Sequence, residues 1–255
     1  MSELPPPPPP NMAPPPGYVA YGGGYSAAGG TFRPVGTLGK WLVALLCVTL
    51  AAQALLVVVQ LTLKDAAEEF LSVGNIDAFD DKLVTYLGLG ALAAIAALAQ
   101  LVILVIWTWR MAKNAQVLGR QPQSFGPGAT IAVNLLGSCT LGILPFFMWR
   151  ELWRASDPQV APGDPSWKQG LVPALIPVHL AFSIASIVSS ISINTGAGVT
   201  VGWTSGGSRK EVAERLSDKL PAIVASGLFA AGAAVVFLLI ARQLTARHMQ
   251  ATREG

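Results

Sequence analysis

The chain has 255 residues, of which 52% are hydrophobic and only 12% are charged. That charged share is about half the share of an ordinary soluble domain, so the long apolar segments indicate an integral membrane protein. The net charge is +3, and the basic residues stand near the ends of apolar segments rather than in a cluster, which argues against nucleic-acid binding. Cys47 and Cys139 lack C-x-x-C or Cys/His spacing, so no disulfide framework, metal site or cofactor is expected.

Residues 1–36 are rich in proline and glycine and open the chain. Such a composition buries too little apolar surface to offset chain entropy, so it predicts a disordered tail. Its proline runs favour polyproline II, which leaves two interpretations: a solvated spacer, or a docking segment for a protein partner. Pro5 to Pro10 stand where a signal peptide would carry charged and apolar regions, so the first span is expected to act as the insertion signal.

Four apolar segments are long enough to cross a hydrocarbon core, which needs about 20 helical residues. They are residues 41–63, 86–109, 170–193 and 222–241. Residues 64–85, between the first two, carry six acidic and two basic side chains, which favours an external loop. Pro173 and Pro177 predict a kink near the start of the third span. Ser208 and Glu211 have the spacing of a capping box, which predicts an amphipathic surface helix before the last span.

A fifth segment, residues 121–149, is charge-free but contains prolines and glycines that interrupt a helix. If it crosses the membrane, Lys and Arg divide 9 to 8 between the two sides, and if it returns they divide 11 to 6. The positive-inside rule favours the second arrangement, with both chain ends cytoplasmic. We therefore expect a broken re-entrant or interfacial segment, with five crossings as the alternative.

Six tryptophans would lie near one interface in this arrangement, as interfacial anchors. They are Trp41, Trp107, Trp109, Trp149, Trp153 and Trp167.

Polar and aromatic side chains gather at the helix ends that flank the broken segment. They are Arg110, Asn114, Trp149, Arg150, Glu151, Trp153, Arg154 and Asp157. Spacings of three or four residues place Arg110 with Asn114, and Glu151 with Arg154, on shared helix faces. The group is either an anchor that reaches toward the headgroups or a surface that binds lipid headgroups or a partner. If the broken segment returns, Arg110 and Glu151 are predicted to form a partly buried ion pair.

His179 lies inside the third span, where an ionisable side chain is a candidate for function. The competing interpretation is a neutral histidine bonded to a serine, because no acidic residue lies within an apolar span to complete a proton relay. Gln53 and Asn134 are interpreted as interhelical hydrogen-bonding residues. No catalytic set appears within the membrane segments, so an enzyme is not expected.

Three patterns resemble a bacterial membrane family known as domain of unknown function 4328. They are R-M-A-K-N-A-Q-V-L-G at residues 110–119, F-G-P-G at 125–128, and E-L-W-R-A-S-D-P at 151–158, after Pro145. Members of the family carry an asparagine shortly before the proline, whereas here Asn134 lies further upstream. The resemblance runs from the second span to the last. It implies a multi-span fold with a Pro/Gly-rich leader and implies no activity.

The sequence therefore predicts an all-α, polytopic helical membrane protein with about four transmembrane helices, one broken segment and a disordered tail. Its parts are the tail 1–36, a membrane domain 37–245 and a short basic C-terminal tail 246–255. We expect a cell-membrane protein, a non-enzymatic scaffold or regulatory component that presents the 110–157 surface. The sequence is compatible with any oligomeric state. The alternative is a small transporter or channel subunit in which the broken segment lines a path past His179.

Overall fold

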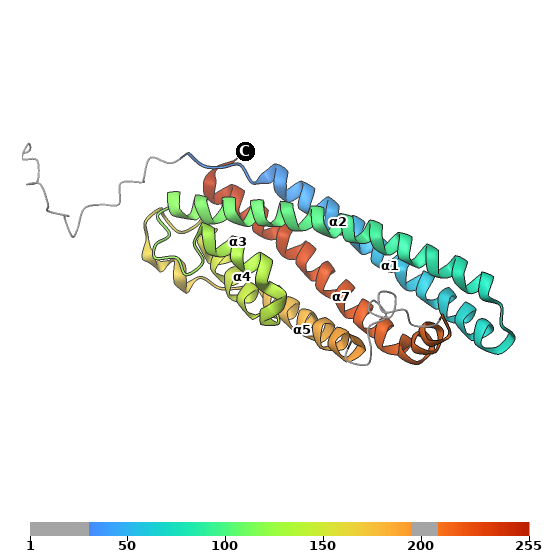
Figure 1. Cartoon of the computed structure of the whole chain (residues 1–255). Helices are drawn as coiled ribbons and strands as arrows, with labels where there is room; N and C mark the ends of the chain where they lie inside the picture. Colours follow the sequence, from blue (N-terminus) through green and yellow to red (C-terminus); the bar gives the residue numbers. More distant parts are fainter. Residues whose placement is uncertain (1–30, 195–208, 255) are drawn as a thin grey trace, which may run out of the picture.

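The protein is a bundle of long helices, seen in a computed structural model that describes residues 31–194 and 209–254. Every regular element within those ranges is helical, which confirms the predicted all-α class. The longest helices are α1 (Gly36–Val73), α2 (Ile76–Val117) and α7 (Arg209–Thr252), and α1 packs against both others along the molecule (Figure 1). Each of the three contains an apolar stretch long enough to cross a membrane.

Helix α5 (Leu175–Asn194) completes the apolar part of the bundle and packs along α7. It corresponds to the third predicted span but begins five residues later. Proline has no backbone N–H and is tolerated best in the first turn of a helix. Pro173 therefore precedes the helix and Pro177 lies in its first turn. The two prolines mark the start of α5 rather than a kink within it.

The acidic connection is a helical hairpin rather than the predicted loop. Helix α1 continues to Val73, Gly74 adopts the left-handed conformation with φ +84°, and Asn75 caps α2 by accepting a bond from the Ala78 amide. Because Gly74 lacks a Cβ, it enters this conformation without strain. The two helices extend past their apolar stretches because this region has an apolar core of its own. That core is formed by Leu63, Ala67, Phe79, Leu83, Val212, Ala213 and Leu216.

Helix α7 contains two elements that were predicted to be separate. The expected surface helix and the last span form one continuous helix, with Pro221 inside it. Val212 and Leu216 face α1 and α2 in the core just described, so the amphipathic face is buried against neighbouring helices instead of lying on a surface. Ser208, the expected first residue of the capping box, lies outside the described residues.

The broken segment is a short helical hairpin. It consists of α3 (Pro127–Leu136), a 3₁₀ turn η1 (Gly137–Thr140) and α4 (Ile143–Ala155), joined at Gly142, whose φ is +80°. Helices α3 and α4 contact each other, and both contact α2. The Glu151 carboxylate near the end of α4 accepts bonds from the amides of Ser124 and Phe125 at 3.1 and 2.9 Å. The segment therefore starts and ends side by side, the geometry that the re-entrant interpretation requires.

The packed helical domain extends at both of its ends beyond the predicted limits of 37 and 245. Val35 is fully buried, and the amides of Val35 and Gly36 donate to the Glu254 carboxylate at 2.8 and 2.9 Å. Glu254 thus supplies a negative group to the start of α1, where the helix dipole favours one. Residues 246–252, predicted as tail, belong to α7, and residues 1–30 of the proline-rich tail lie outside the described residues.

Candidate functional site

The C-terminal ends of α2, α4 and α7 meet the N-terminal end of α1 at one end of the bundle (Figure 1). We call this region the polar end, defined by Arg33, Asn114, Arg120, Ser156, Asp157, His248 and Glu254. Of these, only Asn114 and Asp157 were singled out from the sequence. Asn114, Arg120, Ser156 and His248 are all buried. The region is therefore held together by buried hydrogen bonds that join segments far apart in the chain.

Asn114 connects the segment before α1 to the end of α2. Its Oδ1 accepts from the Arg33 amide at 2.8 Å, and its Nδ2 donates to the Arg33 carbonyl at 2.9 Å. These two bonds fix the orientation of the side-chain amide, because an amide nitrogen only donates and a carbonyl only accepts. Nδ2 therefore donates its second hydrogen to Nε2 of His248, 3.1 Å away.

His248 occupies the centre of the polar end. Since its Nε2 accepts from Asn114, its Nδ1 carries the proton and donates to Ser156 Oγ at 2.8 Å. The residue lies seven positions beyond the apolar stretch 222–241 of α7, and burial lowers its pKa to about 4. The imidazole is therefore neutral at pH 7 and links three helices.

Arg120 organises the loop that follows α4. The side chain is fully buried and donates to backbone carbonyls of Ala155, Asp157, Val160 and Ala161 at 2.6–3.3 Å. Burial lowers the pKa of the guanidinium, and the nearby carboxylates oppose that shift. An arginine remains charged under these conditions because its ordinary pKa is above 12. Arg120 thus fixes a loop that has no regular structure of its own.

Asp157 and Arg154 fix the exit from α4. The Asp157 carboxylate forms a 2.5 Å ion pair with Arg247 of α7, and the Arg247 guanidinium lies over the ring of Trp153 at 5.2 Å. Arg154 donates from Nε to the carbonyl of Gly170 at 3.0 Å. These contacts serve to position the helix end.

The predicted ion pair between Arg110 and Glu151 does not form. Arg110 donates to the Pro34 carbonyl at 2.7 Å, and both oxygens of Glu151 accept from the backbone amides at the start of the hairpin. The prediction was right that these helix ends lie at the same end of the bundle. It was wrong about the partners, because each side chain satisfies nearby backbone groups instead.

Three of the six tryptophans expected as interfacial anchors are inside the protein. Trp107 and Trp149 are buried with ring centroids 6.0 Å apart, and Trp167 is also buried. Trp41 is 61% exposed, and Trp109 lies beneath the Arg33 guanidinium at 4.7 Å. The six residues gather toward the predicted end, but three of them pack the core of that end rather than facing lipid.

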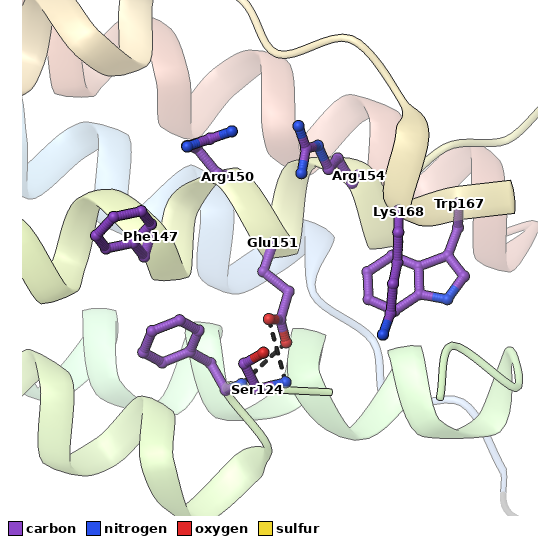
Figure 2. Close-up of a pocket in the computed structure, with 8 residues that line it drawn as sticks. Ser124, Phe147, Arg150, Glu151, Arg154, Trp167 and Lys168 are labelled. Atoms are coloured by element: carbon purple, nitrogen blue, oxygen red, sulfur yellow. Dashed lines mark hydrogen bonds between the residues drawn. The ribbon is translucent and has the colours of Figure 1, made fainter. Parts of the chain in front are cut away.

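A cleft of about 390 Å³ opens beside α4 at the polar end. Its lining residues are Ser124, Phe125, Phe147, Arg150, Glu151, Arg154, Trp167 and Lys168. Figure 2 shows the Glu151 carboxylate directed at Ser124, while Arg150 and Arg154 point away from it. Arg150 contacts the rings of Phe146 and Phe147 and has no ion pair within the described ranges. We call this feature, with its three basic residues Arg150, Arg154 and Lys168, the cationic cleft.

His179 lies away from the polar end, in the interior of the bundle. Its Nδ1 is 3.1 Å from the Ala233 carbonyl, so its partner is the backbone of α7 and not the serine that was predicted. It lines a second cavity together with residues of the broken segment.

The described residues hold no group of three His, Cys, Asp or Glu side chains arranged to bind a metal ion. The polar end pairs its one buried histidine with an amide and a hydroxyl, and the carboxylate of Asp157, next to Ser156, is bound to Arg247. The arrangement that these contacts build is a structural junction with a cationic cleft beside it.

Comparison with known proteins gives a family and no closer relative. No curated protein and no solved structure matches the chain. Residues 72–246 match the family described as Domain of unknown function (DUF4328), which confirms the resemblance inferred from the three sequence patterns. The match runs from the tip of the α1–α2 hairpin to the last turns of α7 and includes the cationic cleft. It covers four residues of the polar end, Asn114, Arg120, Ser156 and Asp157, whereas Arg33, His248 and Glu254 lie outside the matched residues. The chain therefore belongs to the DUF4328 family.

Proposed function

We propose that this protein is a non-enzymatic scaffold or regulatory component of the cell membrane whose cationic cleft binds anionic lipid headgroups at the cytoplasmic surface. One observation carries the proposal. Three basic side chains and one acidic side chain, Glu151, line a single cleft, so positive charge exceeds negative charge there, and the Glu151 carboxylate bonds to two backbone amides rather than to a basic side chain. The cleft thus carries a net positive charge beside aromatic side chains, a combination suited to the boundary between headgroups and hydrocarbon.

The proposal includes a topology of four spans, formed by α1, α2, α5 and α7, with the polar end and both chain ends in the cytoplasm. The 11-to-6 division of basic residues supports it, as does the hairpin geometry of residues 121–149. Reporter fusions test it at Gly74, in the turn between α1 and α2, and at Gly206. We expect both positions to report an external location, and cytoplasmic signals at both would overturn the topology.

Lipid binding is tested with purified full-length protein in nanodiscs of defined composition. We expect phosphatidylglycerol to be retained in preference to phosphatidylcholine when bound lipid is measured by native mass spectrometry. A basic residue near an anionic surface contributes about 1 kcal/mol, so the double variant Arg150→Gln/Lys168→Gln should lower that preference by roughly tenfold or more.

The matched control is Lys82→Gln/Lys210→Gln, which removes two exposed basic residues at the opposite end of the bundle. We expect this variant to keep the preference of the original chain, and added salt to weaken that preference. Equal retention of both lipids by the unaltered protein, or equal loss in the two double variants, would contradict binding in the cationic cleft.

A small transporter or channel subunit is the second candidate function. The observation in its favour is that the broken segment and His179 line the same cavity, as a path through the protein would require. A transporter built from inverted repeats should show corresponding broken segments in both halves. Residues 121–155 form the only such hairpin within the described ranges, which favours the first proposal.

A further inference from the structure

The second cavity lies at the centre of the bundle, beside the turn of the α3–α4 hairpin. Its volume is about 390 Å³, within the range of small-molecule sites, and all of α1, α2, α3, α4, α5 and α7 contribute to its wall. Gly137 and Gly142 line it, so the cavity exists where the hairpin turns back without filling the space between the long helices. Its polar lining residues are Thr49, Gln53, Gln100, Asn134, His179 and Ser183.

The wall of the cavity carries no acidic or basic residue apart from His179. Most of the remaining surface comes from aliphatic and aromatic side chains such as Leu46, Trp149 and Phe237. A charged ligand would enter this apolar environment without a counter-charge, which is costly. The cavity therefore suits an uncharged molecule that is largely apolar.

Asn134 and His179 each present an open hydrogen-bond acceptor on the wall. His179 donates from Nδ1 to the Ala233 carbonyl, an atom that only accepts, so Nε2 of the neutral ring is an acceptor. Asn134 uses both hydrogens of Nδ2, on Thr108 Oγ1 and the Thr130 carbonyl at 2.8 Å each, which leaves its Oδ1 free to accept. Neither His179 Nε2 nor Asn134 Oδ1 has a partner within the described residues, and a ligand that donates hydrogen bonds would satisfy them.

The opening of the cavity lies at the depth of the apolar segments. Gln53 and Ala97 line it and are exposed, and they stand near the middle of the apolar stretches of α1 and α2. Gln53 makes no side-chain hydrogen bond to the described residues, an arrangement that is unfavourable against hydrocarbon alone. A ligand can therefore reach the cavity from within the bilayer, and the Gln53 amide can bind its polar group on the way.

We propose that the central cavity binds an uncharged amphipathic molecule, an alcohol or phenol, which enters from the bilayer and donates its hydroxyl hydrogen to His179 Nε2. The apolar part of the molecule fills the space beside the hairpin turn. This site is separate from the cationic cleft and does not depend on lipid headgroup binding.

The probe is a photoreactive octanol that carries a diazirine, applied to the full chain in membranes and located by mass spectrometry of the labelled peptides. We expect labelling of cavity residues from α3, α4 and α5. Excess octanol should compete, whereas octane, which has the same chain and no hydroxyl group, should compete at least about fivefold less well, since one hydrogen bond is worth about 1 kcal/mol.

Two variants test the contacts. His179→Phe keeps a ring against Phe237, whose centroid is 5.3 Å away, but removes the acceptor, so cavity labelling should fall about fivefold. Ala97→Phe changes an exposed position at the opening, leaves every hydrogen bond intact and should block entry. The matched control is Ser190→Ala. Ser190 lies on α5, the helix that carries His179, but outside the cavity, and the substitution removes its bond to Ser226 of α7.

The thermal midpoint of each variant establishes that it folds. Labelling confined to lipid-facing positions such as Leu92 and Leu98 would overturn the proposal, and so would equal competition by octane and octanol. Cavity labelling that persists undiminished in both His179→Phe and Ala97→Phe would also contradict it.

Discussion

The side-chain amide of Asn114 bonds to the backbone of Arg33 in both directions, accepting at 2.8 Å and donating at 2.9 Å. The two residues are 81 positions apart, so this single side chain attaches the segment before α1 to the end of α2. Asn114 also donates to His248, and the three bonds together join the beginning, middle and end of the chain.

Replacing Asn114 with leucine should be among the most damaging single changes at the polar end. Asn114→Leu keeps the volume but leaves the backbone groups of Arg33 and the buried ring of His248 without their partner, which should cost roughly 2–4 kcal/mol of stability. The measurement is the unfolding midpoint in mild detergent. Gln116→Leu, two residues later on α2 and without a side-chain hydrogen bond to the described residues, is the control and should change the midpoint little.

Two deletions should separate the proline-rich tail from the packed residues that follow it. Removal of residues 1–30 should leave stability unchanged, because their composition contributes little packed surface. Removal of residues 1–36 also deletes Arg33, Val35 and Gly36, with their bonds to Asn114 and Glu254, and should lower the thermal midpoint by several degrees. Equal midpoints for the two truncated chains would show that these contacts contribute nothing.

Arg120→Lys should destabilise the protein although it preserves the charge. Arg120 donates four bonds from a planar guanidinium, whereas a lysine ammonium has three donors at a single point. We expect a loss of roughly 2–4 kcal/mol and faster proteolysis of the loop 156–164. Arg242→Lys, at an exposed position of α7, should behave like the unaltered chain.

The stability of the polar end should depend on pH through His248. Its folded-state pKa of about 4 lies below the unfolded value of about 6.5, so the neutral ring stabilises the fold. The contribution is complete above pH 6.5 and is lost as the pH falls toward 4, with about 2 kcal/mol gone at pH 5.

The check on His248 is denaturant unfolding at pH 7.5 and pH 5. His248→Gln should be less stable at pH 7.5 and should show a smaller fall between the two pH values. A fall of the same size in both proteins would assign the pH dependence to other groups.

Three of the four predicted membrane segments lie in helices long and apolar enough to cross a membrane, but the sequence predicted the ends of these helices poorly. Apolar runs mark where a helix lies in lipid, because transfer energies depend on local composition. The acidic residues of 64–85 looked like a loop for the same reason. That α1 and α2 continue as helices there depends on Leu63 and Phe79 packing against Val212, a contact more than 130 residues distant along the chain, and no local pattern reports it.

The site was predicted in part. The family-like pattern at 110–119 pointed to Asn114, yet its partners at 33 and 248 were missed because nothing local connects them. His248 could have been found as one of two histidines in the chain, placed just past the last apolar segment. Arg120 directly follows the pattern, but the sequence analysis used it only as one of the basic residues counted to orient the chain in the membrane. Hydropathy detects contacts with lipid and does not detect hydrogen bonds between helices.

The length of α1 has a consequence for the membranes that suit this protein. Its 38 residues rise about 57 Å, whereas a hydrocarbon core is about 30 Å thick. A helix that ends at the lipid surface must match that thickness, but α1, α2 and α7 continue together beyond it as a packed bundle. A thicker bilayer would cover a few more turns, and a thinner one would expose them, without breaking a helix. We therefore expect the bundle to tolerate bilayers of different thickness at the end opposite the polar end.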